Sequence, residues 1–334
     1  MSGAPARDTG SVERTPAVPT IRLVSYNIRF GGASRRSAIA DVLGALDADV
    51  VVLQEATDAA VVSWLSGAVG LPHAIAERGR SVALLTRLDV ATSAWHVARP
   101  GRAALDVRLR TRQSDGEDPD LRVVGMHLSA GLSRRGERLR QVEVAGLLAA
   151  LGPTAAHDAW LVGDLNSVAP GDGPRTRGMP IWLRILLRVD GGIRTDVLAR
   201  LAAHGWVDGF RRLHADEPGY TLPPADPSVR LDYVLAPGGE VGRLVACSPV
   251  EPSAAGGRVR VASDHLPLLA EIAILGSMPA SARGSAKKCP GITSSTGGAP
   301  LDAASRPARC ARRYPIPAPR NALMRPTSRR SRSA

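Results

Sequence analysis

Six short apolar segments of this 334-residue chain carry a carboxylate, an amide or an imidazole at or near one end. The polar residues concerned are Asn27, Glu55, His127, Asp164, Asn166, Asp232, Asp264 and His265. An unpaired charge within an apolar strand is costly, so such groups either have partners or lie where strands end. Strand ends on one edge of a sandwich converge, and the loops there carry function. One such residue means little, but six segments together predict a shared site.

The residue types at these ends indicate hydrolysis of phosphate esters. Carboxylate and amide oxygens without cysteine are hard ligands, which suit Mg²⁺ or Mn²⁺ better than zinc. A histidine beside an aspartate, as in Asp264–His265, can act as a general base when a second carboxylate orients the imidazole. A metal, a base and amide donors together are sufficient for hydrolysing a phosphate ester.

Each residue also has a simpler structural explanation. Asn27 could cap a loop with its side chain, as asparagine often does after a strand. Glu55 could be an acid favoured by the dipole of a following helix. Asp232 could form an ordinary ion pair with Arg230. The occurrence of all six segments together favours the shared site over these separate explanations.

Hydrophobic patterning predicts the elements that must position these residues. Strands are expected at 20–28, 49–56, 81–87, 104–110, 121–129, 159–167, 229–236 and 265–275, and helices at 35–48, 58–70 and 136–151. Strands and helices alternate at first, and then strands follow one another without room for helices between them. This pattern predicts an α+β or α/β sandwich of sheets flanked by helices rather than a plain doubly wound sheet.

Composition divides the chain into three parts. Hydrophobic residues make up 44% of the chain, enough for one large domain with a real core. Residues 276–334 hold 12 of the 43 Lys and Arg residues and one acid, so the remainder is about neutral. That segment is rich in Ser, Pro, Ala, Gly and Arg, which is typical of a disordered tail. We therefore predict a disordered segment at 1–19, a folded domain at 20–275 and a basic low-complexity tail at 276–334.

Several classes of protein are not expected. Three scattered cysteines give neither a disulfide framework nor a zinc motif. The N-terminus lacks the pattern of a secretory signal, and the apolar run "IWLRILLRV" is far shorter than the about 20 residues of a membrane span. We expect a cytoplasmic protein without a membrane span, and no obligate protein partner is evident.

The motifs "SYNI", "LQE", "MHL", "GDLN", "RLDYVL" and "SDHLP" occur in that order between residues 25 and 267. They resemble the successive motifs of the endonuclease/exonuclease/phosphatase superfamily. The resemblance extends over the predicted domain and neither tail. It implies a four-layer, deoxyribonuclease-like fold, with two packed mixed β-sheets flanked by helices, and a metal-dependent hydrolase of phosphate esters.

The resemblance also implies a metal site. Glu55 would be the principal ligand of Mg²⁺ or Mn²⁺, with Asn27 close to the metal and its water shell. Asp264 would help to hold the metal. Asp164 would position or activate the attacking water, directly or through a second ion.

The remaining matches imply catalytic roles. His265 would be the base or a phosphate-binding imidazole, oriented by Asp232. Asn166 would donate to a phosphate oxygen, and His127 would contact the phosphate or assist the leaving group. Whether Asp164 or His265 takes the proton from water stays open.

Two further residues are weaker candidates by position. Arg102 lies where relatives often carry an arginine that contacts phosphate. Glu77 is a candidate for orienting His127, as an acid does in the deoxyribonuclease branch. The histidine in "MHL" itself counts against repair of abasic sites, because apurinic endonucleases carry other residues there.

The substrate is less well defined than the chemistry. Arginines in "RFGGASRR" and "SAGLSRRGERLR" could line a polyanion groove or a solvated basic face. The stretch 171–192 could be a short helix packed on the body or a hydrophobic lip for lipid. We favour a Mg²⁺-dependent phosphodiesterase, above all a nuclease. The alternatives are a phosphomonoesterase acting on inositol phosphates, a sphingomyelinase-like lipid phosphodiesterase, and a non-catalytic binding protein of the same fold.

Overall fold

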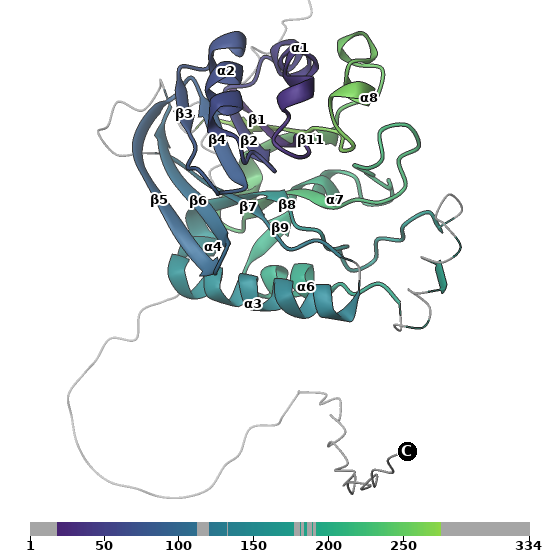
Figure 1. Ribbon diagram of the computed structural model, residues 1–334. Helices are drawn as coiled ribbons and strands as arrows, with labels where there is room; N and C mark the ends of the chain where they lie inside the picture. The colour runs from purple at the N-terminus through teal and green to yellow at the C-terminus, as the bar shows by residue number, and fades with distance from the viewer. Residues whose placement is uncertain are drawn as a thin grey trace, which may run out of the picture. The chain divides into compact units, whose positions relative to one another are not determined.

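Two six-stranded sheets pack face to face in the computed structural model (Figure 1). It describes residues 19–274, except 112–119, 132, 177–180, 182–183, 186–188 and 190–191. The first sheet has the order β11 (Leu244–Pro249), β12 (Leu268–Ala273), β1 (Thr20–Asn27), β2 (Val50–Gln54), β4 (Val82–Thr86), β3 (His73–Ile75). The second has the order β5 (Asp89–Arg99), β6 (Arg102–Arg110), β7 (Leu121–His127), β8 (Ala159–Asp164), β10 (Asp232–Pro237), β9 (Trp206–Asp208).

Helices cover the outer face of each sheet, which makes four layers (Figure 1). The helices are α1 (Arg36–Leu46), α2 (Ala59–Val69), α3 (Arg134–Leu151), α4 (Ala155–Asp158), α6 (Asp196–Ala203), α7 (Gly209–Leu213) and α8 (Val259–Ala262). Short 3₁₀ turns lie at Ala33–Arg35, Val241–Arg243 and Ala255–Gly257. The predicted fold class, two packed mixed sheets flanked by helices, is confirmed.

Three hydrophobic clusters explain the layering. Alternate residues of the strands, such as Leu23 and Val52, fill the space between the sheets. Their neighbours Val24 and Val51 face outward and pack with residues of α1, α2 and α8. A third cluster, which includes Val124, joins the second sheet to α3, α4 and α6. The strands β2, β4, β8 and β10 are buried along their whole length, which explains their largely apolar sequences.

Each sheet contains one parallel pair of strands, and these pairs carry the polar ends. β1 is parallel to β2 and is joined to it through α1, and β7 is parallel to β8 and is joined to it through α3. The carboxyl ends of parallel neighbours lie at the same edge of the sheet. Gly163 allows β8 to approach β7, because a Cβ there would lie 1.8 Å from the Met126 carbonyl oxygen.

The sequence patterns missed four strands, β3, β5, β9 and β11. β5 is an edge strand whose residues are all exposed or half-buried, so it has no clear apolar alternation. The predicted segments 1–19 and 276–334 lie outside the described residues, apart from Pro19. Much of the stretch 171–192 also lies outside them, but Ile181 and Ile185 are described and are exposed.

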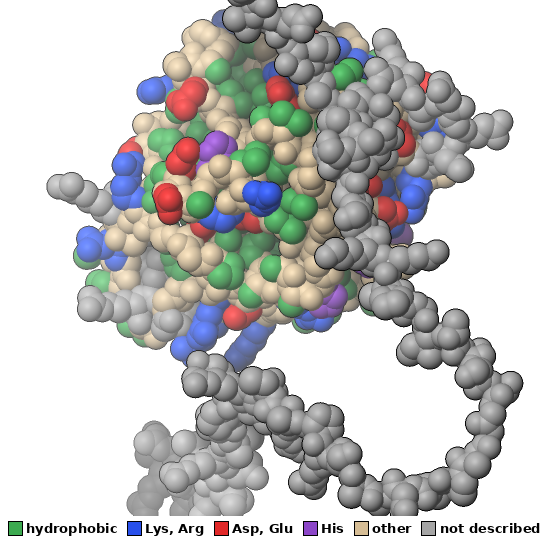
Figure 2. All heavy atoms as spheres, turned by 180° about the vertical axis from the view of Figure 1, so that it is seen from behind, with side chains coloured by type: hydrophobic (Ala, Val, Ile, Leu, Met, Phe, Trp, Pro, Cys, Tyr) green, Lys and Arg blue, Asp and Glu red, His purple; other side chains and the backbone are tan. Residues whose placement is uncertain are grey.

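Two surface properties bear on function. Among the described residues, none of the helices has the length and hydrophobicity needed to cross a bilayer. On the visible part of the face opposite to that of Figure 1, acidic and basic side chains are interspersed among apolar ones (Figure 2). The visible part of that face therefore shows no continuous basic surface of the kind that binds a nucleic acid by charge alone.

Candidate active site

Strand register brings the predicted residues together from both sheets. His127 pairs with Asp164 across β7 and β8, and Asp164 pairs with Asp232 across β8 and β10. In the other sheet, Asn27 ends β1 and Glu55 directly follows β2. β1 and β8 contact each other across the interface between the sheets. The edge predicted from the sequence is therefore the place where the two sheets meet.

Asn27 links carboxylates that belong to different sheets. Its Nδ2 donates to Asp164 Oδ2 at 3.0 Å and to Glu55 Oε1 at 3.3 Å. Its Oδ1 accepts the backbone N–H of Arg29 at 2.9 Å, so the side chain also caps the turn after β1. The amide N–H groups of Asn27 therefore hold the two carboxylates in position, while its oxygen accepts a backbone N–H.

Asp232 and His265 form a buried dyad. His265 Nδ1 lies 2.8 Å from Asp232 Oδ2, and its Nε2 lies 3.9 Å from Asp164 Oδ2. The hydroxyl of Thr221 accepts the backbone N–H of Asp232 at 3.4 Å, and the Thr221 carbonyl accepts that of Leu266 at 2.6 Å. The segment around Thr221 therefore holds both members of the dyad in place.

The electrostatics of this cluster favour a charged His265. Burial disfavours the imidazolium, but the attraction and hydrogen bond of Asp232, together with Asp164 and Asp264, raise the pKa of His265 to about 10. Burial raises the pKa of Asp164 above its usual range, and the neighbouring His265 only partly offsets this. The His265 imidazolium therefore faces the buried side chain of Asp164 at neutral pH.

This arrangement gives a testable titration. In protein stripped of divalent metal, we expect His265 to titrate at about pH 10 rather than near 6.5. Because the folded-state pKa is the higher one, the stabilisation is complete below pH 6.5 and is lost as pH rises towards 10. In Asp232→Asn, we expect a clearly lower pKa, whereas the exposed variant Asp216→Asn should titrate as the parent does. NMR of the imidazole resonances measures this, and a shift of equal size in both variants would contradict the dyad.

His127 lies on the other side of Asp164. Its Nε2 is 3.8 Å from Asp164 Oδ2, and its Nδ1 is buried without a hydrogen-bond partner. Burial lowers the pKa of His127, although Asp164 opposes the shift, while the nearby Arg102 lowers that pKa further. Arg102 and His127 line one small cavity, so Arg102 lies beside the site as expected from its position.

Glu77 does not orient His127. Its carboxylate pairs with Arg80 at 3.3 Å and is half exposed, in the loop between β3 and β4. The expectation for Glu77 was wrong because it rested on position along the chain. The partner of a buried group is set by which strands are neighbours, and β7 has β6 and β8 beside it.

Asn166 and Asp264 lie at the rim of the cluster. Asn166 has a left-handed backbone conformation with φ 48°, and its N–H donates to Asp164 Oδ1 at 2.9 Å. Its side-chain Nδ2 donates to the Leu128 carbonyl at 3.1 Å, which leaves one amide N–H for a substrate. Asp264 is half exposed and lies 3.3 Å from Arg29 Nε.

The structure decides against two simpler explanations of the site residues. Arg230 binds Asp208 at 2.6 Å and Asp172 at 2.8 Å, so it is not the partner of Asp232. Asp58, not Glu55, caps α2, because its carboxylate accepts the N–H of Ala60. Asp232 and Glu55 are therefore not accounted for by an ordinary ion pair or a helix cap.

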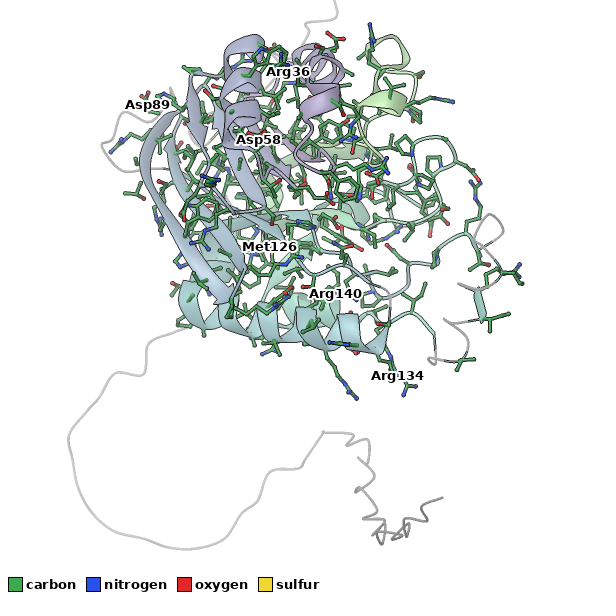
Figure 3. The ribbon with its side chains drawn as sticks, viewed as in Figure 1. Arg36, Asp58, Asp89, Met126, Arg134 and Arg140 are labelled. Carbon is green, nitrogen blue, oxygen red and sulfur yellow. The ribbon has the colours of Figure 1, made fainter. Side chains whose placement is uncertain are left out.

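Sequence reasoning missed the buried charges of α3 that hold the site loops. Arg140 donates to the carbonyls of Ser129 and Gly131 at 2.9 and 2.7 Å and pairs with Glu137 at 2.8 Å. Glu137 also accepts the Ser167 hydroxyl, next to Asn166. Figure 3 shows Arg140 directed toward the body of the protein and Arg134 at the end of the helix.

A second buried acid of α3 fixes the chain that follows His127. Glu143 accepts the N–H of Ser129 at 2.8 Å and pairs with Arg99 of β5 at 2.6 Å. The sequence left open whether the arginines of this helix line a polyanion groove or a solvated basic face. The only sign of this role in the sequence was the large number of charged residues in a helix that directly follows the motif "MHL".

Removal of Arg140 should destabilise the fold. We expect Arg140→Ala to lower the free energy of unfolding by about 3–5 kcal/mol, because it leaves Glu137 buried and unpaired. Arg138→Ala, on the exposed face of the same helix, should change it by less than about 0.5 kcal/mol. Urea denaturation measures both, and similar values for the two variants would show that the buried pair is not structurally important.

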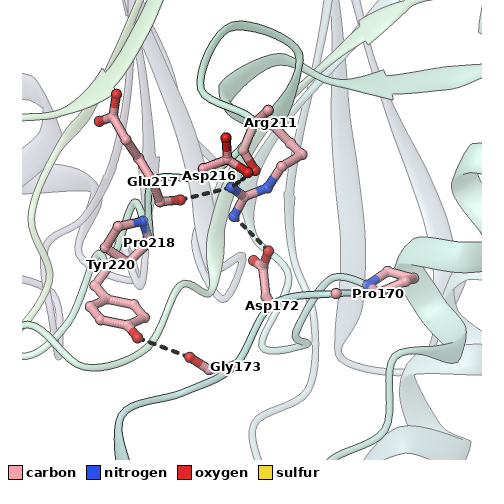
Figure 4. Close-up of a pocket in the computed structure, with 10 residues that line it drawn as sticks. Pro170, Asp172, Gly173, Arg211, Asp216, Glu217, Pro218 and Tyr220 are labelled. Atoms are coloured by element: carbon pink, nitrogen blue, oxygen red, sulfur yellow. Dashed lines mark hydrogen bonds and ion pairs between the residues drawn. The ribbon is translucent and has the colours of Figure 1, made fainter.

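One polar cavity lies outside the cluster of site residues. This cavity of about 390 Å³ is lined by the loops that include Asp172 and Tyr220 (Figure 4). Its cation, Arg211, already donates to Asp172 and to the carbonyls of His214, Ala215 and Glu217. This cavity therefore offers no free cation for a phosphate.

The donor set fits a hard divalent metal. Asp164, Asp232 and His265 offer ligand atoms within 4.8 Å of one another. The hydrogen bond within the dyad engages Asp232 Oδ2, whereas Asp232 Oδ1 is buried without a hydrogen-bond partner. The third member, Asp164, accepts hydrogen bonds from Asn27 and Asn166. Glu55 is tied to it through Asn27, and these carboxylate oxygens suit Mg²⁺ or Mn²⁺.

Known structures share this fold. An AP endonuclease from Archaeoglobus fulgidus matches with a TM-score of 0.58 and 20% identity, covering 76% of this chain and 100% of its own. A Neisseria 3′ phosphatase, NExo, bound to product DNA hairpin, matches with a TM-score of 0.57 and 16% identity, covering 75% and 99%. An endonuclease/exonuclease/phosphatase protein from Beutenbergia cavernae matches with a TM-score of 0.52 and 19% identity. That match covers 76% of this chain and 72% of the other. No curated protein matches the sequence.

The two-sheet sandwich with its buried acidic and imidazole groups defines a class of phosphoester hydrolase. The model of the Endonuclease/Exonuclease/phosphatase family matches residues 24–265, and the chain belongs to that family. The resemblance seen in the ordered motifs is thereby confirmed.

Proposed function

We propose that this chain is a Mg²⁺-dependent phosphodiesterase that cleaves nucleic acid by in-line attack of water. One observation supports the proposal above all others. Asn27 joins Glu55 and Asp164 across the two sheets, and Asp164 lies beside the His265–Asp232 dyad. A module that only binds phosphate has no need of a buried imidazole with its own orienting acid.

The metal would be held by Glu55 and Asp164, with Asp264 at the rim. When bound, it would neutralise charge on the phosphate group. Mn²⁺ has the same preference for oxygen ligands and would serve as a substitute.

Different side chains around the phosphate would accept the proton of the water and stabilise the negative charge that develops. We assign the proton of the attacking water to Asp164, because its buried carboxylate lies between the imidazoles of His127 and His265. The His265 imidazolium would stabilise negative charge that develops on a phosphate oxygen. The remaining N–H of Asn166 and the guanidinium of Arg102 would donate to other oxygens, and His127 would contact the leaving group.

The test is turnover of a panel of substrates with Mg²⁺ and with EDTA. We expect cleavage of DNA or RNA and of bis(p-nitrophenyl) phosphate, lost with the chelator. The KM for nucleic acid should rise steeply with salt, whereas that for the small diester should change little, because several phosphates are bound only in the former. Activity that survives EDTA, or activity confined to sphingomyelin or inositol phosphates, would contradict the proposal.

A further inference from the structure

A left-handed turn follows β1 at the edge of the site. Arg29, Phe30, Gly31 and Gly32 have φ angles of 54°, 47°, 71° and 69°. Glycine adopts this conformation freely, but each other residue pays roughly 1–2 kcal/mol for it. A Cβ at Gly32 would lie 2.7 Å from Ile39 Cδ1, so a larger residue there would also displace the Ile39 side chain. The turn is thus a costly arrangement at the Arg29 and Phe30 positions.

The metal-binding candidate Glu55 holds this turn in place. Its Oε2 accepts the backbone N–H of Phe30 at 2.7 Å, and its carbonyl accepts that of Gly31 at 2.9 Å. From the other side, Arg35 donates to the carbonyls of Ile28 and Arg29. The Phe30 backbone is therefore anchored directly to a residue of the candidate active site.

The fixed turn leaves the phenyl ring in solvent. Phe30 is 80% exposed, whereas Phe210, the other phenylalanine of the chain, is 2% exposed. Burying such a ring normally contributes about 1.5–3 kcal/mol to folding, and Phe30 gives this up while its backbone is strained. Strain that the fold does not recover is commonly found where a residue is positioned for a ligand.

We propose that the Phe30 ring is a stacking platform for a nucleobase of the substrate, next to the phosphodiester at Glu55 and Asp164. This inference rests on the proposed function and narrows the substrate to a strand with an unpaired base. Aromatic rings bind unpaired bases by stacking, with little dependence on sequence. The Arg29 guanidinium lies 5.5 Å from the centre of the ring and pairs with Asp264 at 3.3 Å, and both charged side chains are partly exposed. Insertion into a lipid surface would instead require apolar neighbours.

The test is binding rather than cleavage, so that it does not depend on turnover. A labelled 12-residue oligodeoxythymidylate and an abasic strand of the same length are titrated by fluorescence anisotropy in EDTA. We expect Phe30→Ala to raise the Kd for the thymidylate strand about tenfold, near the weaker end of the range for base stacking. The abasic strand should be unaffected, and Phe30→Trp should bind the thymidylate strand at least as well as the parent.

The outcomes separate the stacking role from the proposed function. Equal effects of Phe30→Ala on both strands, or none on either, would overturn the stacking role. Loss of binding to sphingomyelin vesicles in Phe30→Ala, with oligonucleotide binding unchanged, would also overturn it in favour of a lipid contact. Absence of Mg²⁺-dependent turnover in the parent protein would refute the proposed function separately.

Discussion

Replacing His265 by alanine is expected to lower kcat for a phosphodiester by about 10³-fold, within the range for loss of a positioned acid–base group. The imidazole is buried between Asp232 and Asp164. Its pKa is raised, whereas the pKa of the other imidazole in the site, that of His127, is lowered. The measurement is steady-state hydrolysis of bis(p-nitrophenyl) phosphate with saturating Mg²⁺. KM should change much less than kcat, because the charge develops in the transition state.

A matched control is available on the surface. His204 is exposed at the end of α6, and His204→Ala should retain the parent kcat. Thermal denaturation of both variants shows whether they remain folded. A folded His265→Ala variant with more than about a tenth of the parent rate would remove His265 from the proposed chemistry.

Replacing Glu55 by glutamine is expected to lower kcat/KM by about 10³-fold and to raise the Mg²⁺ concentration needed for half-maximal activity. Glutamine keeps an oxygen that can accept the Phe30 N–H but removes the charge that would hold the metal. Calorimetric titration with Mg²⁺ should show weaker binding in the variant, independently of any substrate.

The exposed Glu251 provides the comparison. Glu251→Gln removes the same charge away from the site and should leave both the rate and the Mg²⁺ affinity as they are in the parent. If Glu55→Gln keeps the Mg²⁺ affinity of the parent, Glu55 is not a ligand of the metal.

Much of the site was predictable because strand ends are visible in a sequence. Asn27, Glu55, His127 and Asp164 each close an apolar run, and such a run ends where the chain leaves the core. The edge strand β5 was missed for the converse reason, since its residues are all exposed or half-buried and lack a clear pattern.

Partners were much harder to predict than positions. Asn27 and Asp164 are 137 residues apart, and their hydrogen bond exists because β1 and β8 cross where the sheets face each other. Glu77 was the predicted partner of His127, but it pairs with Arg80, three residues further along the chain. Arg230 lies two residues from Asp232, yet it binds Asp172 and Asp208.

By itself the sequence determined the fold class, the order of the elements that have a clear apolar pattern, and which polar residues stand at the ends of buried strands. These properties are local, because an apolar run and its polar end are read within a few residues. Only the tertiary structure decided that Asp232 orients His265, that Asn27 joins two carboxylates, that Arg140 is buried and that Phe30 is exposed. Those properties depend on strand register and on the packing of one sheet against the other, which bring together residues from distant parts of the chain.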